Sequence, residues 1–139
     1  MKLRSLEEQN QLITSRLEEG NQLLASWRGA RAKIWLFHVS HMNLAICLSR
    51  FKEREACYVT ATGCLRIAGP FSWKAADISI ARQVLGPNRS EYTVTDQSAG
   101  FELVCRGASV VRGVAFVPVN PFRGFSAEDI PPKLSVPKP

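Results

Sequence analysis

The chain has 139 residues, which is enough for one domain of ordinary size and too few for two. Hydrophobic residues make up 45% of it, which excludes a wholly disordered chain, and no run of about 18 apolar residues exists to form a transmembrane helix. Eighteen Lys and Arg against twelve Asp and Glu leave a net charge of +6; residues 32–115 hold ten basic and six acidic side chains, so +4 of this excess lies there.

Residues 5–28 are predicted to form an amphipathic helix. Ser5, followed three residues later by Glu8, fits a capping box, and Gly29 suits the left-handed residue that ends many helices. Four apolar side chains of this segment fall within about 20° of one line on a helical wheel, with Trp27 next to them. The four are Leu6, Ile13, Leu17 and Leu24. We expect this apolar stripe to be buried against another surface.

The helix contains an internal repeat with an offset of eleven residues. Its first copy reads L-E-E-Q-N-Q-L at residues 6–12, and its second reads L-E-E-G-N-Q-L at residues 17–23. An eleven-residue period fits a nearly straight helix. Alternating spacings of four and three also fit, and they would place Asn10 in the core of a coiled-coil dimer. Two alternatives are therefore open: the helix covers its own sheet, or it joins two copies of the chain.

From residue 32 the pattern changes to β-branched and aromatic runs with a period of two, which is typical of strands. Residues 33–39 and 43–51 are predicted to form a hairpin that is apolar on both faces. The next strand, residues 56–68, should bend at Gly63, and residues 73–85 should follow it as one strand. The remaining predicted strands are 91–95, 101–106 and 109–119, with a tight turn at 98–100.

About seven short strands without intervening helices predict an α+β fold that is mainly antiparallel β. We expect an N-terminal helix followed by a six-to-eight-stranded barrel-like roll or small sandwich. The predicted divisions are the helix at 1–31, the antiparallel β domain at 32–119 and a proline-rich, extended tail at 120–139.

Enzymatic chemistry has little support in the sequence. The common phosphate-loop, dinucleotide, zinc-protease and serine-hydrolase motifs are absent, and we predict neither a cofactor nor a bound metal. His38 and His41 form the only histidine pair, with Cys47 as a conceivable third metal ligand. Cys64, beside the expected bend, would be a nucleophile only with a base next to it. We therefore expect a non-enzymatic domain with buried, structural cysteines.

The expected location is the cytoplasm. No two of the four cysteines form a Cys-x-x-Cys pair, and strand-borne cysteines of this kind are usual in a reducing compartment. The first residues include Glu7, Glu8, Gln9 and Asn10, so they lack the apolar stretch of a secretory signal. No membrane partner is expected.

A basic cluster at Arg50, Lys52 and Arg54 is the best candidate for anion binding. Alternate residues of a strand share a face, and arginine forks suit phosphate or carboxylate. Glu53 and Glu55 interleave with the cluster, so a charged loop with internal ion pairs is the alternative. Three further cations lie upstream and could join it: Arg28, Arg31 and Lys33.

The same segment carries a short resemblance to a known family. R-F-K-E-R at residues 50–54 and D-I-S at residues 77–79 resemble the Arg-x3-Arg and Asp-x-Ser pieces of the PilZ family. PilZ domains are β-barrels that bind a cyclic dinucleotide, so the resemblance implies ligand contacts from Arg50, Arg54, Asp77 and Ser79. The resemblance covers only residues 50–54 and residues 77–79. Arg82 replaces the motif's closing glycine, and an extra hairpin precedes the arginines.

Two functional hypotheses follow. The first is a non-enzymatic binding or scaffold domain that forms a homo-oligomer through the apolar stripe of its helix. The second is recognition of a phosphate-bearing ligand, a nucleotide or a single-stranded nucleic acid, on the basic β surface.

Overall fold

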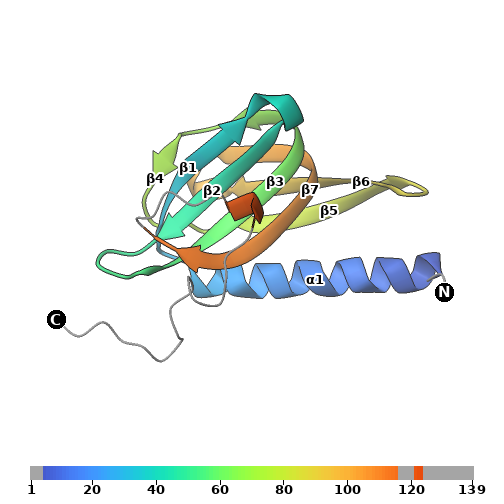
Figure 1. Ribbon diagram of the computed structural model, residues 1–139, viewed down its shortest axis with the longest axis horizontal. Coiled ribbons are helices and arrows are strands. Elements are labelled where there is room, and N and C mark those ends of the chain that lie inside the picture. The colour runs from blue at the N-terminus through green and yellow to red at the C-terminus, as the bar shows by residue number, and fades with distance from the viewer. Residues whose placement is uncertain (1–4, 116–120, 124–139) are drawn as a thin grey trace.

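A computed structural model describes residues 5–115 and 121–123 as one helix followed by a single seven-stranded antiparallel sheet (Figure 1). The strand order is β4-β1-β2-β3-β7-β6-β5, and β4 and β5 do not pair with each other, so the sheet is open. This confirms the predicted α+β roll. The elements are α1 (Leu6–Ser26), β1 (Arg31–His38), β2 (Asn43–Ser49), β3 (Glu55–Ala68), β4 (Ser72–Trp73), β5 (Ser79–Gly86), β6 (Arg89–Asp96) and β7 (Phe101–Val114), with short 3-10 turns at η1 (Val39–His41), η2 (Gln97–Ala99) and η3 (Pro121–Arg123).

The start of α1 follows the signal in the sequence, whereas the helix ends at Ser26, two residues before the predicted end, and Trp27 caps it. The Ser5 hydroxyl accepts a hydrogen bond from the Glu8 amide at 3.1 Å, as a capping residue does. Beyond the last turn, Gly29 takes a φ of 91°, which a residue with a Cβ adopts only with strain. Within the described residues, no helix combines the length and the apolar character needed to cross a bilayer.

The sheet is bent because its two longest strands are bent. β3 and β7 each run for 14 residues and pair along that length, with a register shift next to Cys64. Gly63 lies directly before Cys64, where this shift begins, and has a left-handed φ of 59°, which confirms the predicted bend. The bend brings β1 and β2 over β5 and β6 (Figure 1). The residues between them form one core, whose large, fully buried members include Ile46, Leu48, Val59, Val94 and Leu103.

Helix α1 lies along β5 and β7 and closes the open side of this roll (Figure 1). A smaller cluster covers the opposite face of the sheet, where Tyr58 packs with Cys47 and donates a hydrogen bond to the Val114 carbonyl at 2.8 Å. Strand β2 is therefore buried on both faces, as predicted. Strand β1 is not, because Phe37 near its end is 45% exposed.

Two predicted divisions between strands were wrong. The predicted strands 101–106 and 109–119 are a single strand, β7, because pairing with β3 continues through Gly107. The predicted strand 73–85 is divided into β4 and β5 by a loop in which Ala75 has a left-handed φ of 53°. Residues 116–119 and most of the predicted tail lie outside the described residues; Pro121 is buried, and η3 contacts β3.

Candidate functional site

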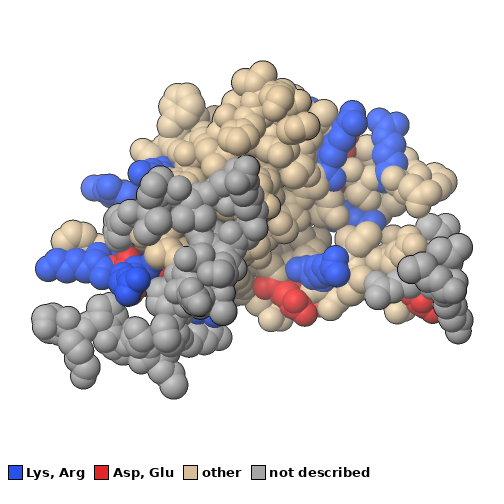
Figure 2. All heavy atoms as spheres, viewed as in Figure 1, with Lys and Arg blue, Asp and Glu red and all other residues tan. Residues whose placement is uncertain are grey.

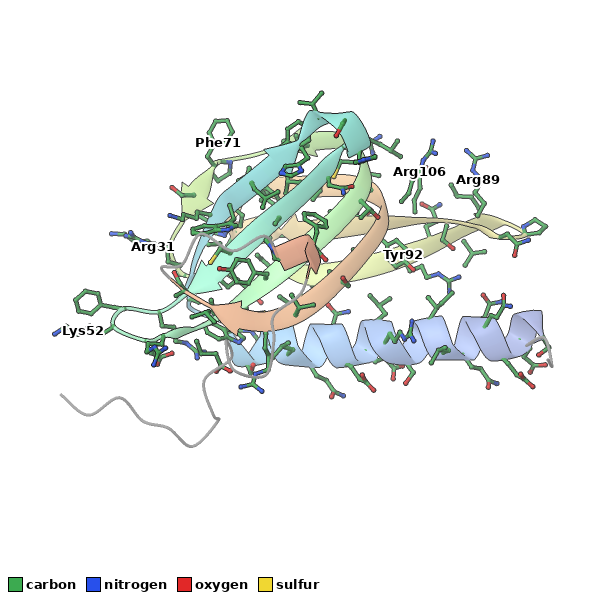
Figure 3. The ribbon with its side chains drawn as sticks, viewed as in Figure 1. Arg31, Lys52, Phe71, Arg89, Tyr92 and Arg106 are labelled. Carbon is green, nitrogen blue, oxygen red and sulfur yellow. The ribbon has the colours of Figure 1, made fainter. Side chains whose placement is uncertain are left out.

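Four cationic side chains surround one surface cavity where α1 joins β1, which we call the junction groove. Arg28 follows α1, Arg31 begins β1, Arg50 follows β2 and Lys74 follows β4, so four separate segments contribute to it. The cavity has a volume of about 710 Å³. Its other lining residues are Gly29, Ala30, Ser49, Phe51 and Ala75. In Figure 3, Arg31 projects outward at this end of the molecule.

Arg50 is held in place by the end of the helix. Its guanidinium carbon lies 4.3 Å from the centre of the buried Trp27 ring, a cation–π contact. One of its nitrogens donates a hydrogen bond to the Ser26 carbonyl, which lies at the negative end of the helix dipole. Another nitrogen lies 3.7 Å from a carboxylate oxygen of Glu53. The position of this side chain is therefore set before any ligand arrives.

The groove keeps an excess of positive charge. Arg28 pairs with Asp77 at 3.1 Å, and Arg50 pairs with Glu53. Within the described residues, Arg31 and Lys74 have no ion-pair partner. Of the four lining cations, two are thus uncompensated.

A buried carboxylate orders the loop that carries Lys74. Asp96 is 1% exposed and accepts hydrogen bonds from the Trp73 indole at 2.7 Å and from the Asp77 amide and the Ser98 hydroxyl at 2.8 Å each. Burial alone would raise the pKa of Asp96, but these hydrogen bonds outweigh it and hold the pKa below its usual value. The Ala76 amide also donates to the Ala30 carbonyl at 2.8 Å, which fixes the loop against β1.

Of the predicted cluster, only Arg50 lines the junction groove. β2 ends at Ser49 and β3 begins at Glu55, so residues 50–54 form a turn, and the alternation of faces expected of a strand does not apply. Lys52 has a left-handed φ of 64°, and its ammonium lies 5.3 Å from the centre of the Phe51 ring. Figure 3 shows Lys52 at the tip of the loop between β2 and β3. Arg54 is exposed outside the cavity.

The upstream cations divide in the same way. Arg28 and Arg31 join Arg50, as the sequence suggested, whereas Lys33 lies over the Trp35 ring at 5.1 Å. Sequence reasoning missed Lys74, because a contact between the β4–β5 loop and the start of β1 leaves no local pattern. It also missed Asp96; the turn-forming residues that follow it were the one available signal.

The apolar stripe of α1 is used largely within the molecule. Leu24 and Trp27 are 2% and 3% exposed within the chain's own core, and Leu17 packs against it. Ile13 is half-buried, while the side chain of Leu6 is outside the described residues. The structure therefore shows the helix covering its own sheet.

The eleven-residue repeat has a matching role. Its second asparagine, Asn21, accepts a hydrogen bond from the Ile80 amide and donates one to the Ile80 carbonyl, both at 2.9 Å. The first, Asn10, accepts from Arg82 at 3.2 Å. Both copies of the repeat thus contact β5, an edge strand of the sheet. Asn21 satisfies the backbone groups of Ile80 that point away from β6.

The cysteines do not form a nucleophilic site in the described residues. All four are free and buried. Burial raises the pKa of Cys64, and burial together with the adjacent Cys64 raises the pKa of Cys105 to about 12. Burial also raises the pKa of Cys57 to about 12. Thiols with such pKa values stay protonated near neutral pH and are poor nucleophiles.

The histidine pair lies at the exposed tip of the β1–β2 hairpin. His38 pairs with Asn43, whereas Cys47 pairs with Lys33 nearer the other end of the hairpin, so Cys47 as a third ligand was wrong. No group of three His, Cys, Asp or Glu side chains in the part of the chain that the structure describes is placed to hold a metal ion.

The four residues implied by the PilZ resemblance do not line one cavity. Asp77 and Ser79 line a separate cavity beside Asp96, and Arg50 lines the junction groove without them. The Asp77 carboxylate is bound instead by Arg28. Comparisons of the chain with family models, with curated proteins and with solved structures find no match.

Proposed function

We propose that this domain is a non-enzymatic binding module that holds a phosphate-bearing ligand in the junction groove. The observation that carries the proposal is the convergence of four cations from four segments on one cavity. Arginine forks bind phosphate through paired hydrogen bonds, and lysine adds a point charge. Because Arg31 and Lys74 have no carboxylate partner among the described residues, they are available to an anion.

An exposed aromatic ring suggests which phosphate compound fits. Phe51 lines the groove and is 89% exposed, an unusual environment for a phenylalanine. Stacking of a nucleic-acid base on such a ring contributes about 1–3 kcal/mol to the binding free energy, whichever base it is. A nucleotide or a single-stranded nucleic acid would therefore use both the cations and the ring.

Self-association through the helix has less support than this ligand-binding function. The residues that would form a helix–helix contact include Leu24 and Trp27, which the chain already buries in its own core. The four free cysteines support the cytoplasmic location that we propose for the domain, since a reducing compartment keeps thiols unpaired.

Calorimetric titration with ATP and with tripolyphosphate, at low and at moderate salt, tests the proposal. Replacing the two unpaired cations, Arg31→Gln with Lys74→Gln, should weaken both ligands by roughly tenfold, because two charge-assisted contacts are lost. Phe51→Ala should weaken ATP and leave tripolyphosphate unchanged. The matched control, Arg89→Gln with Arg106→Gln, removes the same charge elsewhere. Equal losses in both double variants, or no binding of either ligand, would contradict the proposal.

A further inference from the structure

A notch opens in the sheet where β6 and β7 separate. These strands pair only from Tyr92↔Cys105 to Asp96↔Phe101, whereas β7 continues alongside β3 to Val114. Among the described residues, the start of β6 therefore has no strand on its β7 side, and the N-terminal half of α1 lies beneath the β5–β6 hairpin (Figure 1). Two cavities meet here, and they share Ile13 and Tyr92 as lining residues.

The inner cavity, of about 450 Å³, lies between α1 and the sheet. Its walls are mostly apolar and come from both layers: Leu17, Leu23, Ile80, Tyr92, Ala108 and Val110. Arg16 and Glu19 also line it from α1, and both are exposed. At Gly20 the layers come close together, since a Cβ there would lie 3.1 Å from Val110. The cavity is therefore a mostly apolar, partly open space of the size that small ligands occupy.

The outer cavity, of about 980 Å³, carries the charge. Arg82, Arg89 and Arg106 line it from three different strands, against the single carboxylate of Glu91. In Figure 3, Arg89 and Arg106 project together on the side of the hairpin away from α1, and Tyr92 lies on the helix side. Positive side chains gather around this hairpin in Figure 2, apart from those at the opposite end of the molecule.

The arginines of the outer cavity are partly positioned by the fold. Arg82 donates to the Ser90 hydroxyl at 3.1 Å and to the Asn10 side chain at 3.2 Å. The stem of Arg106 lies against Gly63, where a Cβ would approach it to 3.2 Å. Arg89 and Arg106 have no ion-pair partner within the described residues. Two guanidinium groups thus remain available in the outer cavity, which adjoins the apolar cavity at Ile13 and Tyr92.

From this arrangement we infer a second binding site, for a single-chain amphiphile with an anionic head. The chain would occupy the inner cavity between α1 and the sheet. The carboxylate or phosphate head would lie at Arg89 and Arg106, and Tyr92 would line the passage between the two. A neutral or cationic head would lose the charge complementarity that the three arginines supply. The inference does not depend on the junction groove, with which this site shares no lining residue.

Titration calorimetry with dodecanoate, dodecyl phosphate and dodecyltrimethylammonium, each below its micelle concentration, tests this site. The two anionic probes should bind and the cationic one should not, and the comparison of the first two identifies the preferred head. Affinity should rise from hexanoate to dodecanoate as more methylenes are buried, at about 0.8 kcal/mol each, or nearly fourfold in affinity.

Variants locate the two parts of the site. Arg89→Gln with Arg106→Gln should weaken dodecanoate by roughly tenfold, and the matched Arg31→Gln with Lys74→Gln should leave it unchanged. Ala108→Phe should fill the inner cavity and so reduce the dependence of affinity on chain length. The chain-length series uses the natural protein, so its result does not depend on whether a variant folds. Equal affinity for the cationic probe, no effect of chain length, or binding only to phosphatidylglycerol vesicles would overturn the inference.

Discussion

Removing the side-chain amide of Asn21 tests how the helix is attached to the sheet. This amide satisfies both backbone groups of Ile80, a residue 5% exposed on the last strand. Asn21→Ala would remove both hydrogen bonds and leave an amide and a carbonyl with little access to water. Asn10→Ala is the matched control, because it occupies the equivalent position of the repeat but only accepts from an arginine at an exposed site.

The expected cost follows from these contacts. Two neutral hydrogen bonds contribute about 0.5–1.5 kcal/mol each, and leaving a buried group unsatisfied costs about 1–3 kcal/mol. We therefore expect Asn21→Ala to lower the free energy of unfolding by about 2–4 kcal/mol. Asn10→Ala should cost at most about 0.5 kcal/mol. Both substitutions gain the same helix propensity, so this gain cancels in the comparison.

Urea unfolding followed by circular dichroism measures both costs. The difference should appear in the transition midpoint, with the slope unchanged and no dependence on protein concentration. A coiled-coil dimer predicts the reverse: Asn10→Leu would replace a polar core residue, raise stability and make the midpoint depend on concentration. If Asn21→Ala and Asn10→Ala lower the free energy of unfolding equally, the hydrogen bonds of Asn21 to Ile80 do not stabilise the fold, and the role given to the repeat is wrong.

Two further predictions concern buried titratable groups. Asp96→Asn should destabilise the protein by about 2–3 kcal/mol at pH 7, because charge-assisted hydrogen bonds become neutral ones. The pKa of this carboxyl is lowered in the folded state. Its contribution to stability is therefore fully present above the unfolded pKa of about 3.9 and is lost as the pH falls through the folded pKa. Urea midpoints should thus converge between the variant and the natural protein in acid, and a constant difference would contradict this. The free cysteines, with Cys57 and Cys105 at pKa values of about 12, should react with a thiol reagent only as fast as the protein unfolds; rapid labelling of any one in the native protein would contradict their burial.

Much of the fold was predictable because its signals are local. Ser5 and Glu8 mark the start of α1, and Gly63 marks the bend in β3; both depend on residues within a few positions of each other. The boundary between β4 and β5 was not predictable in this way. Alternating residues continue through 73–85, but the Asp77 amide is bound by Asp96 from another strand, and the loop leaves the sheet there. A contact across the fold overrode the local pattern.

The site was only partly predictable for the same reason. Arg28, Arg31 and Arg50 are close enough in sequence to suggest a cluster, yet Lys74 joins them only because Asp96 and Ala30 hold its loop. The prediction also included Lys52 and Arg54, since it assumed an extended strand where the chain turns. Side-chain alternation predicts faces well inside a strand, and it loses meaning at the residue where pairing stops.

Two separate basic cavities allow a test that neither would allow alone. Each double variant removes two positive charges from a chain of net charge +6, so any ligand attracted by the overall field should be weakened equally by both. Of the two double variants, a nucleotide in the junction groove should respond only to the one at Arg31 and Lys74, and an amphiphile at the notch only to the one at Arg89 and Arg106. Adding salt should weaken the nucleotide steeply, whereas the buried chain of the amphiphile should retain part of its affinity. If both variants weakened both ligands by the same factor, net charge rather than either cavity would explain the binding.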